Sequence, residues 1–288
     1  MSVPAIVCVG LATQDTVFHV PHPPGSGGRV VATDLVTAGG GPAATAAVTV
    51  ARLGVEAAFV GAVGDDDVGH AIRDGLAAEG VDVSELRVVP GARSPRSALL
   101  VEGRTAERSI VHYPGTLAPL DLSERAVALC RGAEWVHVDQ LGYAAAPKGV
   151  RLSIDGGNPI PGLDLDGVAL YAPTEAALLA AYGGPDNALA AGAQLVVATR
   201  GAGGCVAYGR DGMTLEVDGF EVEAVSALGA GDVFHGALLA QLVLGDELPL
   251  ALRRANLAAA LSCRALDARS AIPWRQELDE RSSTWQDA

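Results

Sequence analysis

Cysteine is scarce in this chain, and no pair of cysteines has the spacing of a redox or metal motif. The 288 residues contain four cysteines and no CxxC pair. Each cysteine lies far from the others in an apolar stretch, where a free thiol packs as a small hydrophobic side chain. We therefore expect buried free thiols in a reducing compartment, not disulfides or a metal site, at Cys8, Cys130, Cys205 and Cys263.

Basic residues are also in short supply. The chain has 20 Lys and Arg residues against 34 Asp and Glu residues, which gives a formal net charge of -14. This balance argues against nucleic acid or an anionic membrane as the main partner, because both attract positive protein surfaces. An anionic small substrate is still allowed where local donors outweigh the overall field.

Long apolar runs are absent. No run approaches the length of a membrane-spanning helix. The first apolar segment, "AIVCVGLA", follows no basic region and is broken by Gly10, Thr13, Gln14 and Asp15 within a few residues. It predicts a first buried strand rather than a signal peptide, and we expect a cytoplasmic protein with no membrane partner.

Several common catalytic motifs are missing as well. The chain has no GxxxxGK[ST], no GxGxxG after a strand, no GxSxG and no HExxH. These absences exclude a P-loop protein, the dinucleotide fingerprint, the usual hydrolase nucleophile and a common zinc site. His137 in "EWVHVDQL" is therefore interpreted as a strand residue with a satisfied ring.

The sequence does contain a repeated alternation of strands and helices. Apolar runs such as "AIVCVGLA" and "EAAFVGAVG" are followed by the helical segments "AATAAVTVARLG" and "DVGHAIRDGLAAEG". The rhythm resumes later with "EWVHVDQL", "VRLSIDGG", "GVALYAP" and "QLVVATRG". This pattern predicts one α/β domain over residues 1–288 with a mostly parallel sheet, and ligands bind at the C-terminal ends of such strands.

Two segments interrupt this rhythm. "GRVVATDLVTA" (residues 28–38) predicts a partly alternating strand on an exposed sheet, and "RSALLVEGRTAERSIVHYPG" (residues 96–115) predicts a hairpin around "EGRTAER". Together they indicate a small sheet outside the main fold. The tail from Arg275 is expected to be loosely ordered.

The stretch "SALGAGDVFHGALLAQLV" places three small residues before an acidic one where an apolar helix begins. Ser226 or Gly229 can start this helix. Bare N–H groups at a helix N-terminus form an anion site, and Asp232 could either cap the helix or carry out proton chemistry beside the anion. The residues alone leave both interpretations open.

Two further features suit a small polar ligand. Gly39, Gly40 and Gly41 precede a helix and form either a tight turn or a backbone that a ligand can approach closely. Asp15 is either a solvated loop carboxylate or a group that binds hydroxyls, since a carboxylate accepts two hydrogen bonds from a diol.

Taken together, these motifs resemble the ribokinase-like (PfkB) family of sugar and nucleoside kinases. The resemblance rests on "GGGPAATAAVTVARLG", "VGAVGDDDVGHAIRDGLAAEGVDV" and "GAGDVFHGAL" in this order, and it covers nearly the whole chain. It implies a three-layer α/β/α sandwich with a small β-sheet lid formed by about residues 12–38 and 92–115. Closure of such a lid excludes water that would compete with the sugar hydroxyl.

The resemblance also implies a chemistry, which is phosphoryl transfer from ATP to a hydroxyl of a ketose or related small sugar. Asp232 corresponds to the family's general base, and Gly229, Ala230 and Gly231 would offer N–H groups to the transferring phosphoryl group. The other matching positions are Thr199, Gly201 and Gly204 for the nucleotide phosphates and ribose, Asn256 for the adenine side, Glu175 for Mg²⁺ through water, and Asp15, Gly39 and Gly40 for the sugar.

The family resemblance implies Mg²⁺ as cofactor and leaves a monovalent cation open. The exposed edges of the lid strands predict a homodimer that pairs through the lid. Two alternatives remain, which are a nucleoside kinase of the same family and a ribokinase-fold sugar-binding protein with little turnover.

The chain also departs from the family pattern. Ser226, Ala227 and Leu228 stand where Asp-Thr-Thr is usual, and Ala172 and Ala44 stand where the family has Asn. These changes remove a carboxylate, hydroxyls and amides near the metal, the phosphate and the sugar. Lower activity, or a metal held differently, would follow.

Within the family, the motifs look most similar to the sulfofructose kinase branch. Its sulfonate-binding Lys, Asn and Arg positions correspond here to Arg29, His112 and Leu141. One of two cations is lost, and an apolar side chain cannot stabilise a desolvated sulfonate. We therefore expect a different substrate, such as a neutral ketose or another polyol.

Overall fold

The central sheet carries most of the fold. The protein is represented by a computed structural model that describes residues 3–284. Nine strands lie in the order β13-β12-β11-β10-β9-β8-β1-β4-β5. All neighbours pair in parallel except β11–β12 and β12–β13. The strands are β1 (Ile6–Val9), β4 (Ala57–Gly64), β5 (Leu86–Val89), β8 (Trp135–Val138), β9 (Leu152–Asp155), β10 (Leu170–Ala172), β11 (Leu195–Thr199), β12 (Cys205–Gly209) and β13 (Thr214–Val217).

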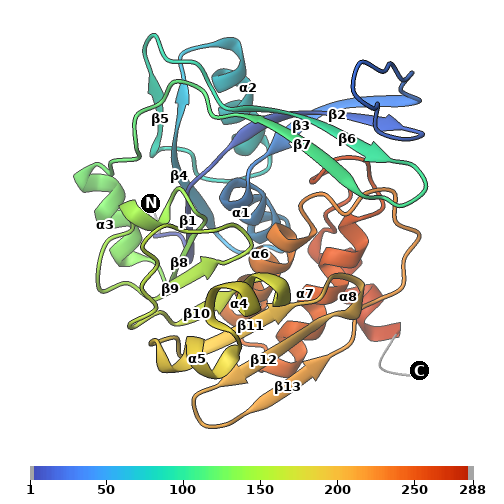
Figure 1. The fold of residues 1–288 in the computed structure, drawn as a ribbon. Coiled ribbons are helices and arrows are strands. Elements are labelled where there is room, and N and C mark those ends of the chain that lie inside the picture. The colour runs from blue at the N-terminus through green and yellow to red at the C-terminus, as the bar shows by residue number, and fades with distance from the viewer. Residues whose placement is uncertain (1–2, 285–288) are drawn as a thin grey trace.

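Helices cover both faces of this sheet (Figure 1). Side chains alternate along a strand, so Ile6 and Cys8 face one helical layer while Val7 and Val9 face the other. The first layer contains α1 (Pro42–Arg52), α2 (Asp67–Ala78), α6 (Ala230–Val243), α7 (Leu248–Ser262) and α8 (Arg275–Thr284); the second contains α3 (Glu124–Gly132), α4 (Glu175–Tyr182) and α5 (Pro185–Ala190). Two short 3₁₀ turns are Tyr143–Ala145 and Gly201–Gly203. The predicted α/β/α sandwich is confirmed.

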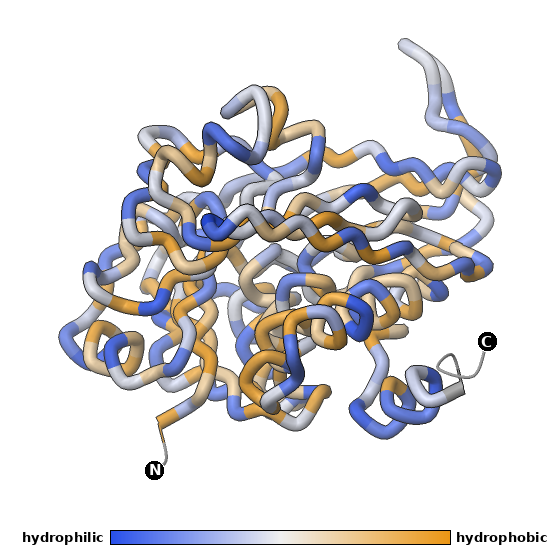
Figure 2. Tube along the Cα trace, turned by 90° about the horizontal axis from the view of Figure 1, so that it is seen from below, coloured by the Kyte–Doolittle hydropathy of each residue, from blue (hydrophilic) through white to orange (hydrophobic). Residues whose placement is uncertain are grey.

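A second, four-stranded sheet forms the lid. Its strands are β2 (Thr13–Val20), β3 (Asp34–Gly40), β6 (Arg96–Glu102) and β7 (Arg108–Tyr113), in the order β3-β2-β6-β7. The predicted hairpin is the antiparallel pair β6–β7, while β2 and β6 run parallel. On the inner face, Val17, Leu99 and Val101 pack against residues of two loops of the main domain, namely Leu228, Leu266 and Ala268. Figure 2 shows hydrophobic and hydrophilic positions along the lid strands.

Two sequence expectations about local structure are wrong. Residues 28–33 are not part of a strand, because β3 begins at Asp34 and Val31 is 80% exposed. The tail is not loosely ordered over residues 275–284, since α8 occupies them; residues 285–288 lie outside the described part. Figure 2 shows α8 as a mainly hydrophilic helix, but Leu278 is buried and Arg275 pairs with Asp279 one turn later.

The prediction of buried free thiols is confirmed for three of the four cysteines. All four thiols are free, and Cys8, Cys130 and Cys205 are buried, whereas Cys263 is only half-buried. In the part of the chain from residue 3 to 284, we find no helix with both the length and the hydropathy needed to cross a bilayer.

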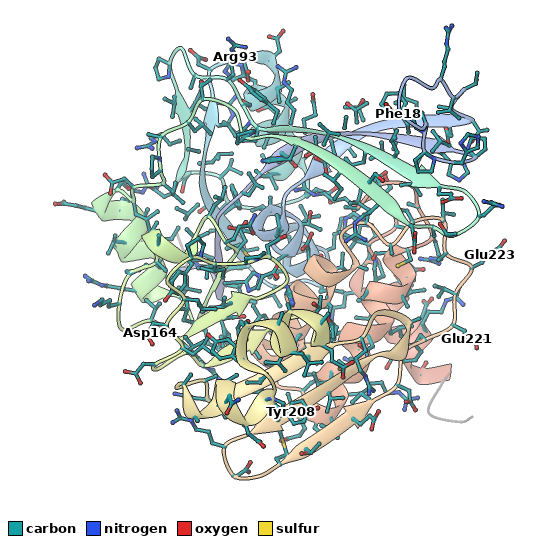
Figure 3. All side chains as sticks on the ribbon, viewed as in Figure 1. Phe18, Arg93, Asp164, Tyr208, Glu221 and Glu223 are labelled. Carbon is teal, nitrogen blue, oxygen red and sulfur yellow. The ribbon has the colours of Figure 1, made fainter. Side chains whose placement is uncertain are left out.

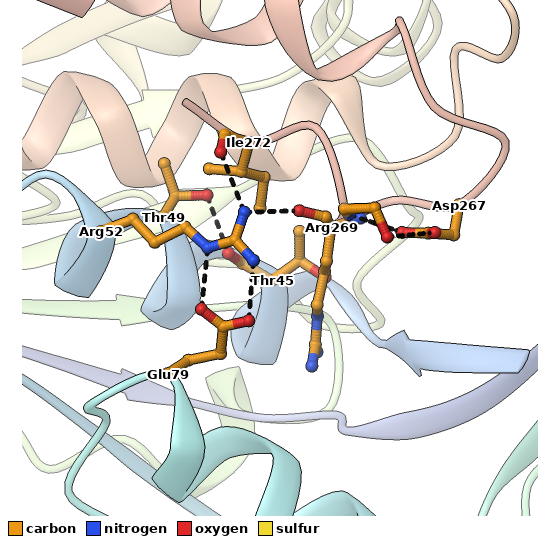
Figure 4. A network of polar contacts seen from close by, with 8 residues as sticks. Thr45, Thr49, Arg52, Glu79, Asp267, Arg269 and Ile272 are labelled. Carbon is orange, nitrogen blue, oxygen red and sulfur yellow. Dashed lines mark hydrogen bonds and ion pairs between the residues drawn. The ribbon is translucent and has the colours of Figure 1, made fainter. Parts of the chain in front are cut away.

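A buried arginine joins the C-terminal segment to the first two helices (Figure 4). Arg52 forms a bidentate ion pair with Glu79, with Nη2–Oε1 and Nε–Oε2 distances of 2.7 and 2.8 Å. Its Nη1 donates to the carbonyls of Arg269 and Ile272 at 2.8 and 2.9 Å. The loop between α7 and α8 is therefore fixed to α1 and α2.

Replacing Arg52 should destabilise the protein strongly. We expect Arg52→Met to lower the free energy of unfolding by about 3 kcal/mol, because Glu79 and two backbone carbonyls lose their partner. Arg73→Met is the control, since the Arg73–Asp74 pair is largely exposed and should contribute under about 1 kcal/mol. Urea unfolding measures both, and equal midpoints for the two variants would contradict the assignment.

Candidate active site

Polar side chains gather where the parallel strands end. β8 is followed by Asp139, β9 ends at Asp155, and β11 ends at Thr199. An isolated bridge between Thr174 and Thr199 brings the start of α4 beside the end of β11. The carboxyl edge of the sheet therefore presents carboxylates and hydroxyls side by side, as expected for a ligand site in a parallel sheet.

Asp139 fixes the geometry of this edge. Its Oδ2 accepts from the N–H groups of Leu11 and Ala43 at 2.7 and 3.3 Å. Its Oδ1 accepts from Leu141 and Gly142 at 2.9 and 3.0 Å. Burial raises the pKa of Asp139, and these four N–H groups oppose that rise. One carboxyl group thus joins the end of β1, the start of α1 and the turn after β8.

The start of α6 lies at this edge and has free donors. Gly229 is the N-cap with a φ of 72°, a left-handed conformation that favours glycine. Asp232 lies in the first turn but forms no side-chain capping bond. Among the described residues, the N–H groups of Gly231 and Asp232 have no hydrogen-bond acceptor. They are available to an anion.

The ionisation of Asp232 is shifted towards neutral pH. Burial, as the largest cause, and the carboxylates of Asp155 and Asp139 together raise its pKa to about 7, while His235 acts in the opposite direction. Arg108, which reaches from β7 of the lid, also lowers it. A carboxyl group that titrates near pH 7 suits general acid–base chemistry.

A large cavity adjoins the same helix start. Its volume is about 770 Å³, and its lining includes Ala227, Ala230, Gly231 and Phe234 of the α6 region. Most of the other lining residues come from the loop after β11, the loop after β13 and the helix α7. Figure 3 labels Glu221 and Glu223 on the loop that leads from β13 to α6, and both line this cavity. The space is sufficient for a nucleotide-sized ligand.

The predicted nucleotide residues come together around this cavity. Thr199, Gly201, Gly204 and Asn256 all line it. The amide Nδ2 of Asn256 donates to the carbonyls of Val217 and Asp218 at 3.2 and 3.1 Å, so this side chain also holds the end of β13.

The predicted sugar residues on the lid form one row. Asp15 pairs with Ser97, and Ser97 pairs with His112, so the three side chains lie on the same face of the lid. Ser97 Oγ is 3.3 Å from His112 Nδ1, and Thr13 Oγ1 donates to Asp15 at 2.7 Å. Burial raises the pKa of Asp15, while Thr13, Ser97 and more distant cations lower it.

Three predicted site residues lie further apart. Arg29 is an exposed residue in the loop between β2 and β3, beyond the end of the lid strands opposite to Asp15. Leu141 is 52% exposed on the loop after β8, and its N–H is bound by Asp139. Glu175 is an exposed residue in the first turn of α4. The structure therefore does not bring Arg29 to the row of Asp15 and His112.

The departures from the family pattern have a structural counterpart. Ser226 Oγ accepts from the N–H of Leu228 at 3.2 Å, which keeps the turn before Gly229 folded. Leu228 itself is buried against the lid. Ala44 and Ala172 are buried in the apolar core. Leu228, Ala44 and Ala172 therefore pack and offer no side-chain donor or acceptor, and the Ser226 hydroxyl is used within its own turn.

The sequence did not reveal a buried polar cluster beneath α6. His137, Ser153 and Asp155 occupy alternate positions of β8 and β9 and face α6, whose His235 lies 3.5 Å from Asp155. The prediction that the ring of His137 is satisfied is only half right. Its Nδ1 is 3.1 Å from Ser153 Oγ, but its buried Nε2 has no partner among the described residues. Polar residues at alternate positions of central strands were the available signal.

Three features of this edge suit phosphoryl transfer. They are a nucleotide-sized cavity, free N–H groups at a helix start, and a carboxyl group with a pKa of about 7 on the residue that follows Gly231 of the cavity lining. The chain belongs to the pfkB family of carbohydrate kinases, whose family description matches residues 3–153 and 168–275. The predicted enzyme class, a phosphotransferase with an alcohol group as acceptor, is confirmed.

Individual relatives are ribokinases and fructokinases. The chain is 30% identical over 294 residues to the ribokinase of Bacillus subtilis, which covers 96% of this chain and 98% of that protein. It is 29% identical to a fructokinase of Salmonella typhimurium, over 86% and 92% of the two chains. The fold matches that of Arabidopsis thaliana ribokinase complexed with ribose and ATP, with a TM-score of 0.83 and 24% identity over 98% and 99% of the chains. These relatives do not confirm the sulfofructose kinase branch.

A glycine beside Asp139 provides a test of this edge. A Cβ at Gly10 would fall on the Asp139 carboxylate. We expect Gly10→Ala to displace that carboxylate and to lower the free energy of unfolding by about 1–3 kcal/mol. Gly75→Ala in α2 is the control, because its Cβ would meet open space, and it should stabilise the protein by up to about 1 kcal/mol. If denaturation shows Gly10→Ala to be as stable as the wild type, the close approach is not a constraint.

Proposed function

We propose that this carbohydrate kinase transfers the γ-phosphoryl group of ATP to a hydroxyl of a small neutral sugar, a pentose or a ketose. Asp232 accepts the proton of the attacking hydroxyl. The oxygen then forms a bond to the γ-phosphorus while the bond from phosphorus to the bridging oxygen breaks and ADP leaves. The observation that carries this proposal is the position of Asp232 in the first turn of α6, directly after Gly231, which lines the large cavity.

The start of α6 would stabilise the charge of the transferring group. The N–H groups of Gly231 and Asp232 have no acceptor among the described residues, and the helix dipole adds a partial positive charge at this end. Gly229, Ala230 and Gly231 have no bulky side chains, so phosphate oxygens can approach the backbone. Arg108 of the lid is a cation close enough to lower the pKa of Asp232.

The nucleotide occupies the cavity of about 770 Å³ in this proposal, with Thr199, Gly201 and Gly204 at its phosphates and ribose and Asn256 on the adenine side. The Arabidopsis relative of the same fold was solved with ribose and ATP.

A magnesium ion fits the donors that are present. No cluster of three or more metal-binding side chains occurs among residues 3–284. Mg²⁺ in kinases needs none, because it is held by one or two carboxylates together with waters and substrate phosphates. Glu175 would serve as that carboxylate through water, and the ion would offset phosphate charge. A monovalent cation stays a prediction.

The sugar side supports a neutral acceptor. Asp15 and Ser97 can bind hydroxyl groups, as can the backbone at Gly39 and Gly40. Leu141 offers no charge, and Arg29 lies beyond the opposite end of the lid strands. A fixed anionic group on the sugar would therefore lack both of the cations expected from the sulfonate pocket.

Pairing of two lids in a homodimer is also a proposal. It rests on the edge strand β7, all of whose residues are exposed.

Removing the carboxylate of Asp232 should abolish catalysis selectively. We expect Asp232→Asn to lower kcat by roughly 10²–10⁴-fold, the usual contribution of a general base. ATP binding should persist, because size and donors are kept and one negative charge is removed. Asp186→Asn, in the exposed first turn of α5, is the control and should be unaffected. ADP release with ribose, fructose and a sugar panel gives the rate, and calorimetry gives ATP affinity. Wild-type turnover in Asp232→Asn would exclude the assignment.

The pH dependence should reflect the same group. A general base acts in its ionised form, which for Asp232 predominates above a pKa of about 7. We therefore expect kcat/KM for the sugar to reach a plateau above that pH and to fall about tenfold for each pH unit below it. Initial rates from pH 5 to 9 in constant ionic strength test this. An acid limb centred at about 4, the ordinary range of a carboxyl group, would show that burial does not shift Asp232.

A further inference from the structure

A buried histidine, His235, follows the proposed base by about one helical turn. His235 is on α6 three residues after Asp232, and residues with this spacing share one side of a helix. Its ring is 4% exposed, and its Nδ1 is 3.5 Å from Oδ2 of Asp155, which is also 4% exposed. An ion pair without access to water is only weakly screened. His235 and Asp155 therefore form a buried pair close enough to the proposed base to act on its charge.

The titratable and charged groups around Asp232 and this pair come from six segments of the described structure. Asp232 lies on the same helix, Asp155 on β9, His137 and Asp139 on or after β8, Arg108 on the lid strand β7, and Arg269 on the loop before α8; the remaining titratable neighbour of Asp155 is Tyr171 on β10. Three of these groups are carboxyls, and the two arginines approach from the lid and the C-terminal loop.

Only one of the two neighbouring imidazoles can carry charge. Burial, as the largest cause, and His235 together lower the pKa of His137 to about 3 against the opposite effect of Asp155, so His137 is neutral. Its ring centroid is 5.5 Å from that of His235. For His235, burial lowers the pKa, but Asp155, Asp232 and the backbone of Ala172 together raise it above its ordinary value. The cation of this cluster is thus His235.

We propose that His235, held as an imidazolium by Asp155, is a positioning residue that keeps Asp232 in the ionised form needed for proton abstraction. This inference rests on the proposed function of Asp232. Asp155 alone would act against that ionisation, since two carboxylates near each other resist a second negative charge. His235 offsets Asp155 and attracts Asp232. The net charge of the His235–Asp155 pair near the base is therefore close to zero, whereas Asp155 alone would be negative.

This arrangement has an electrostatic signature that simple packing lacks. Replacing His235 leaves the Asp155 anion uncompensated, so Asp232 should become harder to ionise. Replacing Asp155 removes an anion and also the group that keeps His235 charged, so the two effects on Asp232 should nearly cancel. A second change at Asp155 should therefore reverse the effect of a change at His235.

The test compares pH profiles of kcat/KM for His235→Asn, Asp155→Asn and the double variant, using the sugar that the wild type phosphorylates best. We expect His235→Asn to move the acid limb up by about one pH unit, which is a tenfold loss at a fixed acidic pH. The double variant should return the limb towards its wild-type position. His70→Asn is the control, because His70 forms a similar pair with Asp65 at 3.3 Å but is largely exposed, and its profile should not move.

Two outcomes would overturn the proposal. One is a His235→Asn enzyme whose rate falls equally at all pH values, and the other is a shifted limb that Asp155→Asn does not reverse. Nitrogen NMR of the imidazole rings in the wild type gives a readout that does not need a folded variant, and a neutral His235 ring at pH 7 would also overturn it. Failure of the proposed function gives a different result. In that case the Asp232→Asn variant keeps its turnover, irrespective of the effect of the His235 variant.

Discussion

The whole ligand-binding edge depends on one buried carboxyl group. Asp139 accepts backbone N–H groups from three separate segments, at Leu11, Ala43 and the turn Leu141–Gly142. Leu11 leads into the lid, Ala43 starts α1 after the glycine turn, and Leu141 follows β8. These N–H groups lie past strand ends or at a helix start, where the backbone has no regular partner. The carboxylate replaces those partners, and so the segments that carry the proposed sugar site keep one arrangement relative to the sheet.

The face of the sheet that packs against α6 carries buried polar and charged side chains in place of apolar ones. His137, Ser153 and Asp155 stand where central parallel strands normally carry aliphatic side chains. Burying such groups is costly unless they are paired, and pairing here requires a cation from the helix. The requirement couples α6 to β9 in a way that hydrophobic contact alone would not, because the partner must be at a single position of the helix.

Local features were predictable from sequence, and long-range ones were not. The alternation of strands and helices, the hairpin in residues 96–113 and a helix that starts at Ser226 or Gly229 follow from patterns within about twenty residues, and the structure selects Gly229. Asp139 could not be assigned because its donor Leu11 is 128 residues away in the chain. Residues 28–33 carry β-branched side chains but have no partner strand, so propensity gave a strand where the structure has a loop. The expectation that Arg29 belongs to the substrate site was connected with this error, because Arg29 was expected at the start of that strand.

The attachment of the lid has a mechanical consequence. All four lid strands join the main domain at the same end, at Thr13, Gly40, Arg96 and Tyr113, and the opposite end carries only the connections 21–33 and 103–107 (Figure 1). The end next to Asp15 is therefore fixed by four chain connections, whereas the outer part is held by apolar contacts of Val17, Leu99 and Val101 with Leu228, Leu266 and Ala268. If these contacts separate, the outer end moves further than the row of Asp15, Ser97 and His112. Access for solvent then changes at the outer end while the inner end keeps its arrangement.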